Sequence, residues 1–548
     1  MWIFIYICAA AFMYWMLYDR PLIGIDDANI YFIYMRNFAN GLGFVYNFGG
    51  ERVEGFTSVL WTLIGSLFFT LSRSPEIVLL ICNIFLIAFS LWALVIFNDR
   101  LNGDSRTITP TTYFICGALL LVPGYFDWTI LSLMETGLWS FLLILSVITL
   151  CRFELMDENH RKNNLILSAL LILLVLTRPE SYFFGFTFLL IRAWQLKTAS
   201  VKNNSVKLIH IIIPMAGFIA AIAGITTWRL NYFGYPLPNT YYAKISGGIF
   251  RNFVDGLKYD IHFFINYSFL FVIIIMAIAF CHSIIKHRKS DPMARVAVII
   301  FTVIITALII PFYTGGDHFV LSRFIQPVLP LFYLMFAIIV SGYFNLKKFV
   351  THHYLKISLV LLLIALTPAY SLIYYASGKG PLCMDLNLAN VDRVKGNRLS
   401  DFFREAKQYP VFGVISAGAE VYTYAGASID LLGLNNTSIA HARHEKQGPK
   451  NHSFDKGSFF SLSPDFFVFA DFPVDTTNYV IFEKSNTYQR EWFQKLYRGL
   501  FGEKEFVENY FPVFIFRKDA KEILHTYANK NFLSRLDPTH YSYSIIPR

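Results

Sequence analysis

The chain has 548 residues, of which 55% are hydrophobic and only 15% are charged. Soluble domains usually carry about 25% charged residues, so the composition excludes an ordinary soluble protein. The net charge of +10 does not indicate a nucleic-acid partner, because the basic residues gather in short loops between apolar segments, as in membrane proteins of defined orientation.

Apolar segments long enough to approach the thickness of a bilayer recur along the first two thirds of the chain. They predict a polytopic α-helical membrane protein with about eleven transmembrane helices. The expected spans are 2–18, 76–97, 109–123, 133–150, 165–177, 182–195, 208–228, 265–285, 294–312, 325–344 and 357–375.

The basic loops fix the expected orientation. They lie between alternate spans and are richest at 152–162, 197–207, 286–295 and 347–356, which predicts that these loops face the cytoplasm. The apolar segment 57–72 is short and opens with Thr57 and Ser58, so we interpret it as a helix lying flat on the membrane. The chain would then begin inside and end outside; the membrane we expect, from the family resemblance described below, is a bacterial inner membrane.

Polar residues that are costly at membrane depth collect in the loops expected outside. The first outer loop, 19–75, opens with the adjacent carboxylates Asp26 and Asp27, where the chain should leave the bilayer. We interpret this pair as catalytic and prefer Asp26, because it comes first after the span. The other candidates in and beside these loops are expected to bind substrate: Glu54, Glu135, Arg178, Glu180, Asn239, Tyr242, Lys244, Asp317, His318 and Arg323.

Residues 376–548 form a second, polar region, which we expect to be an extracytoplasmic α/β domain with a role in binding glycan. Strands are predicted at 410–415, 466–470, 479–482 and 513–516, and helices at 398–408 and 490–500. A Gly- and Pro-rich loop in this region contains His444, Glu445 and Lys446, which we expect close to the acceptor path. The absence of an HExxH motif and of Cys/His zinc spacing predicts no metal site here.

Two other classes of protein fit the composition. A transporter for lipid-linked sugars would concentrate its polar residues near the membrane midplane, and few lie there. An envelope receptor that only binds glycan would not need an acidic pair at the membrane edge. No phosphate-binding loop, GxGxxG motif or DxD triplet is present, which disfavours use of a soluble nucleotide sugar.

An ordered set of motifs resembles the GT-C glycosyltransferases, which use polyprenyl-phosphate sugars, and within them the terminal arabinofuranosyltransferases of the mycobacterial cell wall. The resemblance runs from the first outer loop to about residue 470. Its motifs are DDANIYFIYMRNFANGLGFVYN, ERVEGFTSVLW, LMETGLW, RPES, LPNTYYAK, GGDHFVLSRFIQPVLPL, DLLGLNN and HEK. The composition departs from high-GC relatives in being rich in Lys, Ile and Phe.

The resemblance implies that the Asp pair catalyses transfer of arabinofuranose from a polyprenyl-phosphate donor. The acceptor would be an envelope polysaccharide, a lipopolysaccharide or a pilin, and another lipid-linked sugar, such as mannose or aminoarabinose moved to lipid A or protein, is the alternative within the same class. The leaving lipid phosphate needs cations, and Arg178, Lys244 and Arg323 are the candidates. The chemistry requires no soluble cofactor and is compatible with a divalent cation.

Overall fold

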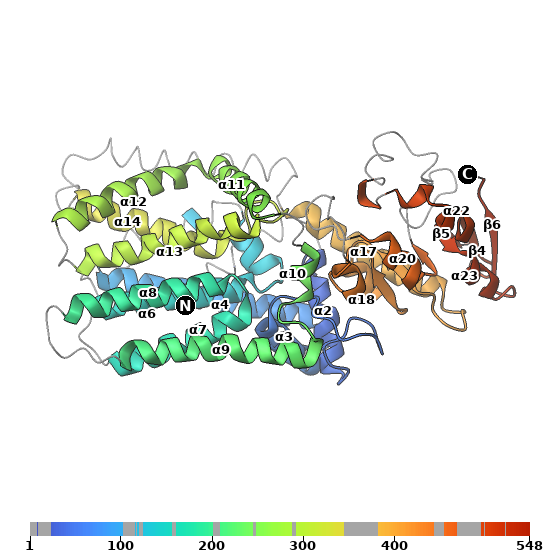
Figure 1. Ribbon diagram of the computed structural model, residues 1–548, viewed down its shortest axis with the longest axis horizontal. Helices are drawn as coiled ribbons and strands as arrows, with labels where there is room; N and C mark the ends of the chain where they lie inside the picture. The colour runs from blue at the N-terminus through green and yellow to red at the C-terminus, as the bar shows by residue number, and fades with distance from the viewer. Residues whose placement is uncertain are drawn as a thin grey trace.

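The computed structural model gives the protein an elongated shape, with a helical bundle at one end and a sheet domain at the other (Figure 1). The first outer loop lies between them. The structure describes residues 8, 23–101, 115–116, 118–119, 124–155, 160–200, 209–244, 248–287, 292–344, 382–442, 454–467, 495–497, 499–520 and 522–547.

The bundle is built from long apolar helices that run side by side along the length of the molecule (Figure 1). Most of the side chains of α6 and α13 are buried, so these two helices form the centre of the bundle. The bundle helices are α4 (Pro75–Leu101), α6 (Thr136–Leu155), α7 (His160–Thr177), α8 (Ser181–Ser200), α9 (Ile209–Phe233), α12 (Ser268–His287), α13 (Pro292–Thr314) and α14 (Leu329–Phe344).

Within the described residues, four helices are long and apolar enough to cross a membrane: α4, α6, α9 and α13. The count is five if α11 (Ile249–Asn266) and the following helix, bent by 107°, are one span. The predicted spans 165–177, 182–195 and 325–344 form the helices α7, α8 and α14. Spans 2–18, 109–123 and 357–375 lie largely outside the described residues, so the count of eleven stays a prediction.

The first outer loop is more helical than the sequence suggested. Residues 26–39, part of the polar first outer loop, form helix α2 (Asp26–Ala39), and nine of its side chains are buried. The apolar segment 57–72 becomes α3 (Val59–Leu71), capped at its start by the Ser58 hydroxyl. At about 1.5 Å per residue, α3 is roughly 20 Å long and too short to cross a bilayer core of about 30 Å by itself.

The C-terminal domain holds a six-stranded mixed sheet of order β2-β1-β3-β5-β4-β6. Its strands are β1 (Phe412–Val414), β2 (Ser428–Asp430), β3 (Phe466–Phe467), β4 (Tyr510–Arg517), β5 (Glu522–Asn529) and β6 (Tyr541–Ile545). Helices α17 (Cys383–Phe402) and α18 (Ala419–Thr423) lie between this sheet and the bundle, against α2 (Figure 1).

The strand predictions at 410–415, 466–470 and 513–516 coincide with β1, β3 and β4. The helix predicted at 398–408 was wrong in extent, because α17 starts fifteen residues earlier and ends at Phe402. Strands β2, β5 and β6 were not predicted from the sequence. The strand predicted at 479–482 lies outside the described residues, and so does the helix predicted at 490–500 apart from its last few residues.

Candidate functional site

Helix α2 points its N-terminus at the junction of the bundle and the C-terminal domain, and the two carboxylates stand in its first turn. Acidic side chains are favourable there because they face the positive end of the helix dipole. The Asn29 side chain holds this turn, since its amide donates to the Ile25 carbonyl at 2.8 Å and its oxygen accepts from Arg393 at 2.8 Å. Both carboxylates are therefore held on a rigid helix end.

Asp26 faces the C-terminal domain. Its Oδ1 accepts a hydrogen bond of 2.7 Å from the backbone N–H of Ala419, at the start of α18. A Cβ on Gly418 would lie 1.9 Å from the Asp26 carbonyl oxygen, so only glycine allows the chains to approach this closely. These contacts give Asp26 a structural role between the two domains, which weakens our sequence-based preference for it as the catalytic residue.

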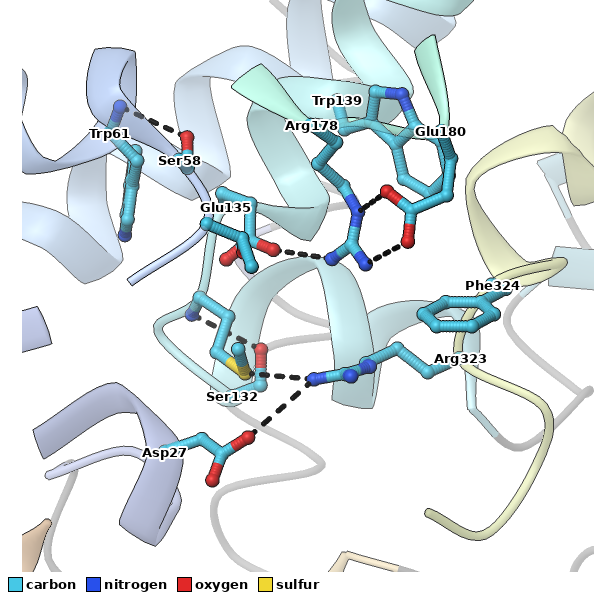
Figure 2. Close-up of polar contacts among 12 residues, drawn as sticks. Asp27, Ser58, Trp61, Ser132, Glu135, Trp139, Arg178, Glu180, Arg323 and Phe324 are labelled. Carbon is cyan, nitrogen blue, oxygen red and sulfur yellow. Dashed lines mark hydrogen bonds and ion pairs between the residues drawn. The ribbon is translucent and has the colours of Figure 1, made fainter. Parts of the chain in front are cut away.

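Asp27 faces a cation instead. Its Oδ2 lies 4.0 Å from Nη1 of Arg323, and its side chain keeps 22% of its surface exposed (Figure 2). The Arg323 Nε also donates to Asp317 at 2.9 Å, and the guanidinium carbon lies 4.5 Å from the centre of the Phe319 ring. Arg323 thus lies between two carboxylates, and one of them, Asp27, is partly exposed to solvent.

Two further predicted residues join this group. Burial lowers the pKa of His318, and the positive charges of Lys244 and Arg323 lower it further, against the opposing effects of Asp27 and Asp317. The five side chains therefore lie near enough to interact electrostatically. We call Asp27, Lys244, Asp317, His318 and Arg323 the acid–cation cluster.

Asp385 on α17 was not among the sequence candidates. Burial raises its pKa to about 6, the negative charge of Asp27 adds to the rise, and Arg323 opposes it. Asp385 therefore borders the acid–cation cluster from the C-terminal domain. A single acid on a helix about 360 residues from Asp27 carries no local signal that could have revealed it.

A second charged group lies beside the cluster. The Arg178 guanidinium donates to both oxygens of Glu180, at 3.0 and 2.8 Å, and also contacts Glu135 (Figure 2). All three side chains are at least 90% buried. Arg178 and Arg323 both lie against the ring of Phe324, at 5.2 and 5.5 Å from its centre. The predicted residues of three separate loops therefore meet at one place.

The backbone around these side chains adopts rare conformations. Four described residues other than glycine have positive φ, and three of them border the two charged groups: Leu133 at 57°, Leu321 at 61° and Ser322 at 52°. Such residues cost free energy and persist where surrounding packing holds them, often at functional sites. The strained pair at 321–322 comes directly before Arg323 and sets its direction.

Two sequence candidates lie apart from the cluster and make structural contacts. Glu54 forms a buried two-pronged ion pair with Arg229 of α9, with distances of 2.9 to 3.1 Å. The Asn239 amide, at the start of α10 (Asn239–Lys244), donates to the carbonyls of Gly433 and Leu434 at 2.8 and 3.0 Å. These contacts tie the first loop to the bundle and the bundle to the C-terminal domain.

Tyr242 also lies at the junction between domains. Its ring centre is 4.2 Å from that of His441, and the His441 ring also stacks on Tyr235 at 4.0 Å. The remaining candidates, His444, Glu445 and Lys446, lie outside the described residues. In the part of the chain that the structure describes, no three His, Cys, Asp or Glu side chains come together in a way that could hold a metal ion.

The shifted pKa values of two buried carboxyl groups at the junction lead us to predict that the stability of the protein depends on pH. Burial raises the pKa of both Asp26 and Glu420 to about 8. Because unfolded carboxylates titrate near pH 4, the folded state binds more protons between about pH 4 and 8, and its stability falls as the pH rises through that window. We expect the double variant Asp26→Asn/Glu420→Gln to be more thermostable than the parent at pH 8.5 and to differ little at pH 4. Thermal unfolding at both pH values checks this, and an equal difference at both would contradict it.

Comparisons with known proteins identify the fold. Neither a protein-family model nor a curated protein matches the sequence. Among solved structures, apo ArnT from Cupriavidus metallidurans is similar with 14% identity and a TM-score of 0.51, over 84% of this chain and 90% of that one. ArnT bound to undecaprenyl phosphate matches with 11% identity and a TM-score of 0.51, over 84% and 91%.

The apo oligosaccharyltransferase of Archaeoglobus fulgidus matches with 12% identity and a TM-score of 0.53, over 96% of this chain and 74% of that one. The chain has the GT-C fold. This likeness agrees with the expected fold class, a helical membrane part followed by a C-terminal domain with a sheet. At these identities it establishes the fold and leaves the arabinofuranosyltransferase resemblance a hypothesis.

Proposed function

We propose that the protein is a membrane glycosyltransferase that moves a sugar from a polyprenyl-phosphate donor to a hydroxyl of an envelope acceptor. The observation that carries this proposal is the partly exposed Asp27 carboxylate facing Arg323, with Lys244 and His318 close by. A base beside fixed cations, at the junction of an apolar bundle and a polar domain, suits a donor that is lipid at one end and sugar phosphate at the other. The similar fold of ArnT, a protein seen bound to undecaprenyl phosphate, supports such a donor.

Asp27 is the proposed base. Its carboxylate accepts the proton of the acceptor hydroxyl as the acceptor oxygen bonds to the anomeric carbon. The bond between the anomeric carbon and the phosphate oxygen breaks with its electron pair, and polyprenyl phosphate leaves. Because burial holds the pKa of His318 below its ordinary value, His318 is neutral near pH 7 and is a hydrogen-bonding group there.

The three cations proposed for the phosphate are not equivalent. No described carboxylate lies within ion-pair distance of Lys244, so its charge is open to a ligand. Arg323 shares its charge between Asp27 and Asp317. Arg178 is occupied by two carboxylates and deeply buried. We therefore propose that Lys244 and Arg323 hold the phosphate and that Arg178 supports the site from behind.

The proposed sugar is arabinofuranose, on the motif resemblance, and the proposed acceptor is an envelope polysaccharide, lipopolysaccharide or pilin. Transfer of aminoarabinose or mannose to lipid A or protein is the second candidate, favoured by the fold likeness to ArnT. Incubating the purified protein with synthetic polyprenyl-phosphate sugars tests both. Release of polyprenyl phosphate from one donor only, and only with acceptor present, identifies the sugar. Release from none of them would contradict the proposal.

The phosphate assignment predicts a loss of donor affinity. We expect Lys244→Ala to weaken binding of undecaprenyl phosphate by roughly 10-fold or more, because a charge-assisted contact contributes about 1.5–3 kcal/mol. The matched control is Lys258→Ala on α11, whose side chain is 66% exposed and pairs with Asp255 at 3.9 Å. Binding measured on both variants separates the two lysines, and equal losses would remove Lys244 from the site.

The site should face away from the cytoplasm if the basic loops orient the chain as proposed. The exposed turn at Gly49 belongs to the first loop, two residues after Asn47, which bonds to Ser428 of the C-terminal domain. A cysteine introduced at Gly49 should react with a membrane-impermeant thiol reagent in intact spheroplasts. One introduced at Lys197, at the opposite end of the bundle, should react only after the membrane is opened. The reverse pattern would overturn the orientation.

A further inference from the structure

A cavity of about 320 Å³ lies between the first loop and the C-terminal domain. It belongs to a different set of residues from the acid–cation cluster. Its lining comes from the chain after α2, from β2 and the chain that follows it up to α19 (Thr437–Ala440), and from one residue of α20 (Lys456–Leu462). The lining residues that matter are Asn47, Glu51, Ser428, Asn435, Asn436 and Ser438.

The walls of this cavity are fixed by hydrogen bonds. Strand β2 is the edge strand of the sheet, and the Asn47 amide pairs with it as a neighbouring strand would. Its Nδ2 donates to the Ser428 carbonyl at 2.7 Å, and its Oδ1 accepts from the Ser428 N–H at 2.9 Å. The Glu51 carboxylate accepts from the Thr437 N–H at 3.0 Å. The cavity is thus formed before any ligand arrives.

The lining has a distinctive chemistry. Among the described residues, the lining presents amides, hydroxyls and one carboxylate beside the apolar side chains of Val53, Ile429 and Leu462, and it includes no Lys, Arg or His. The Ser428 side chain is 1% exposed, and its Oγ has no hydrogen-bond partner within the described part of the chain. Buried hydroxyls are normally paired, so this one marks a place where a polar partner is needed.

We infer that this cavity binds one neutral sugar unit of the acceptor glycan. Ligand sites commonly occupy about 300–1,000 Å³, so the volume suits a single sugar ring. Closely spaced amides, hydroxyls and a carboxylate offer the mixed donors and acceptors that sugar hydroxyls require. The inference rests on the proposed function. It places an acceptor subsite on the C-terminal domain, against residues 46–53 of the first loop.

Binding can be measured without turnover. The Asp27→Asn protein, full length and in lipid nanodiscs, is titrated with two neutral probes, an arabinofuranosyl disaccharide and a mannosyl disaccharide, and saturation-transfer NMR reports the contact. We expect at least one probe to bind. Ser438→Trp plugs the cavity from its exposed helix turn and should weaken that binding by 10-fold or more. Ser461→Trp, also exposed but outside the lining, is the matched control and should bind as the parent does.

Each outcome decides one question. Loss of binding in Ser438→Trp alone, with the thermal midpoint unchanged, supports the acceptor subsite. Equal binding in both tryptophan variants, or binding of neither neutral disaccharide by the parent, overturns it. Because the probes are tested without a donor, on a variant whose transfer is expected to be slowed roughly 100-fold or more, the result is separate from the transfer assay. If the protein transfers sugar but binds neither disaccharide, only the subsite is wrong. If it binds a disaccharide but transfers no sugar, only the proposed function is wrong.

Discussion

Replacing Asp27 by Asn should reduce sugar transfer by roughly 100-fold or more, because the amide keeps the shape of the side chain but cannot accept the proton of the acceptor. Donor binding should persist, since the cations that hold the phosphate remain. The measurement is the rate of acceptor-dependent polyprenyl phosphate release, compared at equal amounts of folded protein in membranes.

The matched control is Asp26→Asn, one residue away. An asparagine oxygen can still accept the hydrogen bond from Ala419, so we expect this variant to keep most of its activity. If Asp26→Asn loses activity and Asp27→Asn keeps it, the roles assigned to the two carboxylates are reversed. Normal rates in both variants would exclude the pair from catalysis.

Replacing Arg178 by Met should destabilise the protein severely. The change leaves Glu135 and Glu180 buried without a counter-charge, and breaking a buried pair in this way costs about 3–5 kcal/mol. We expect low yield and a large fall in the thermal midpoint. Adding Glu135→Gln and Glu180→Gln to the same chain should recover part of the loss, because the buried charges are then gone.

Arg251→Met on α11 is the comparison for a weak ion pair. That arginine is 50% exposed and lies 3.8 Å from Asp255, and exposed pairs contribute about 0–1 kcal/mol. A variant Arg178→Met that unfolds like the parent but no longer binds undecaprenyl phosphate would show that Arg178 holds the donor. The original sequence-based role of Arg178 would then be correct.

Much of the fold was predictable from the sequence, because apolar length and loop charge are local properties. Spans such as 76–97 and 208–228 match α4 and α9 within a few residues. Helix α2 escaped prediction because its aromatic and amide side chains show no simple apolar stripe. It is stabilised by packing against α3 and the C-terminal domain.

The candidate site was predictable in its residue types and less so in its pairings. The motif around Arg323 indicated a cation in an outer loop, yet only the folded chain shows that Asp27, and not Asp26, faces it. Glu54 and Asn239 looked like ligand-binding residues because polar groups near membranes are rare. Their partners, Arg229 and the carbonyl of Gly433, lie 175 and 194 residues away in the sequence, so no local pattern reveals them.

The most direct test of the proposed site is an experimental structure of the full chain with undecaprenyl phosphate bound. We predict the phosphate between Lys244 and Arg323, with the Asp27 carboxylate open to the side from which an acceptor would approach. Two results would contradict the assignment of the acid–cation cluster as the place of transfer. In one, the phosphate binds Arg178 in place of Glu180; in the other, it lies on the opposite side of α2 from Asp27.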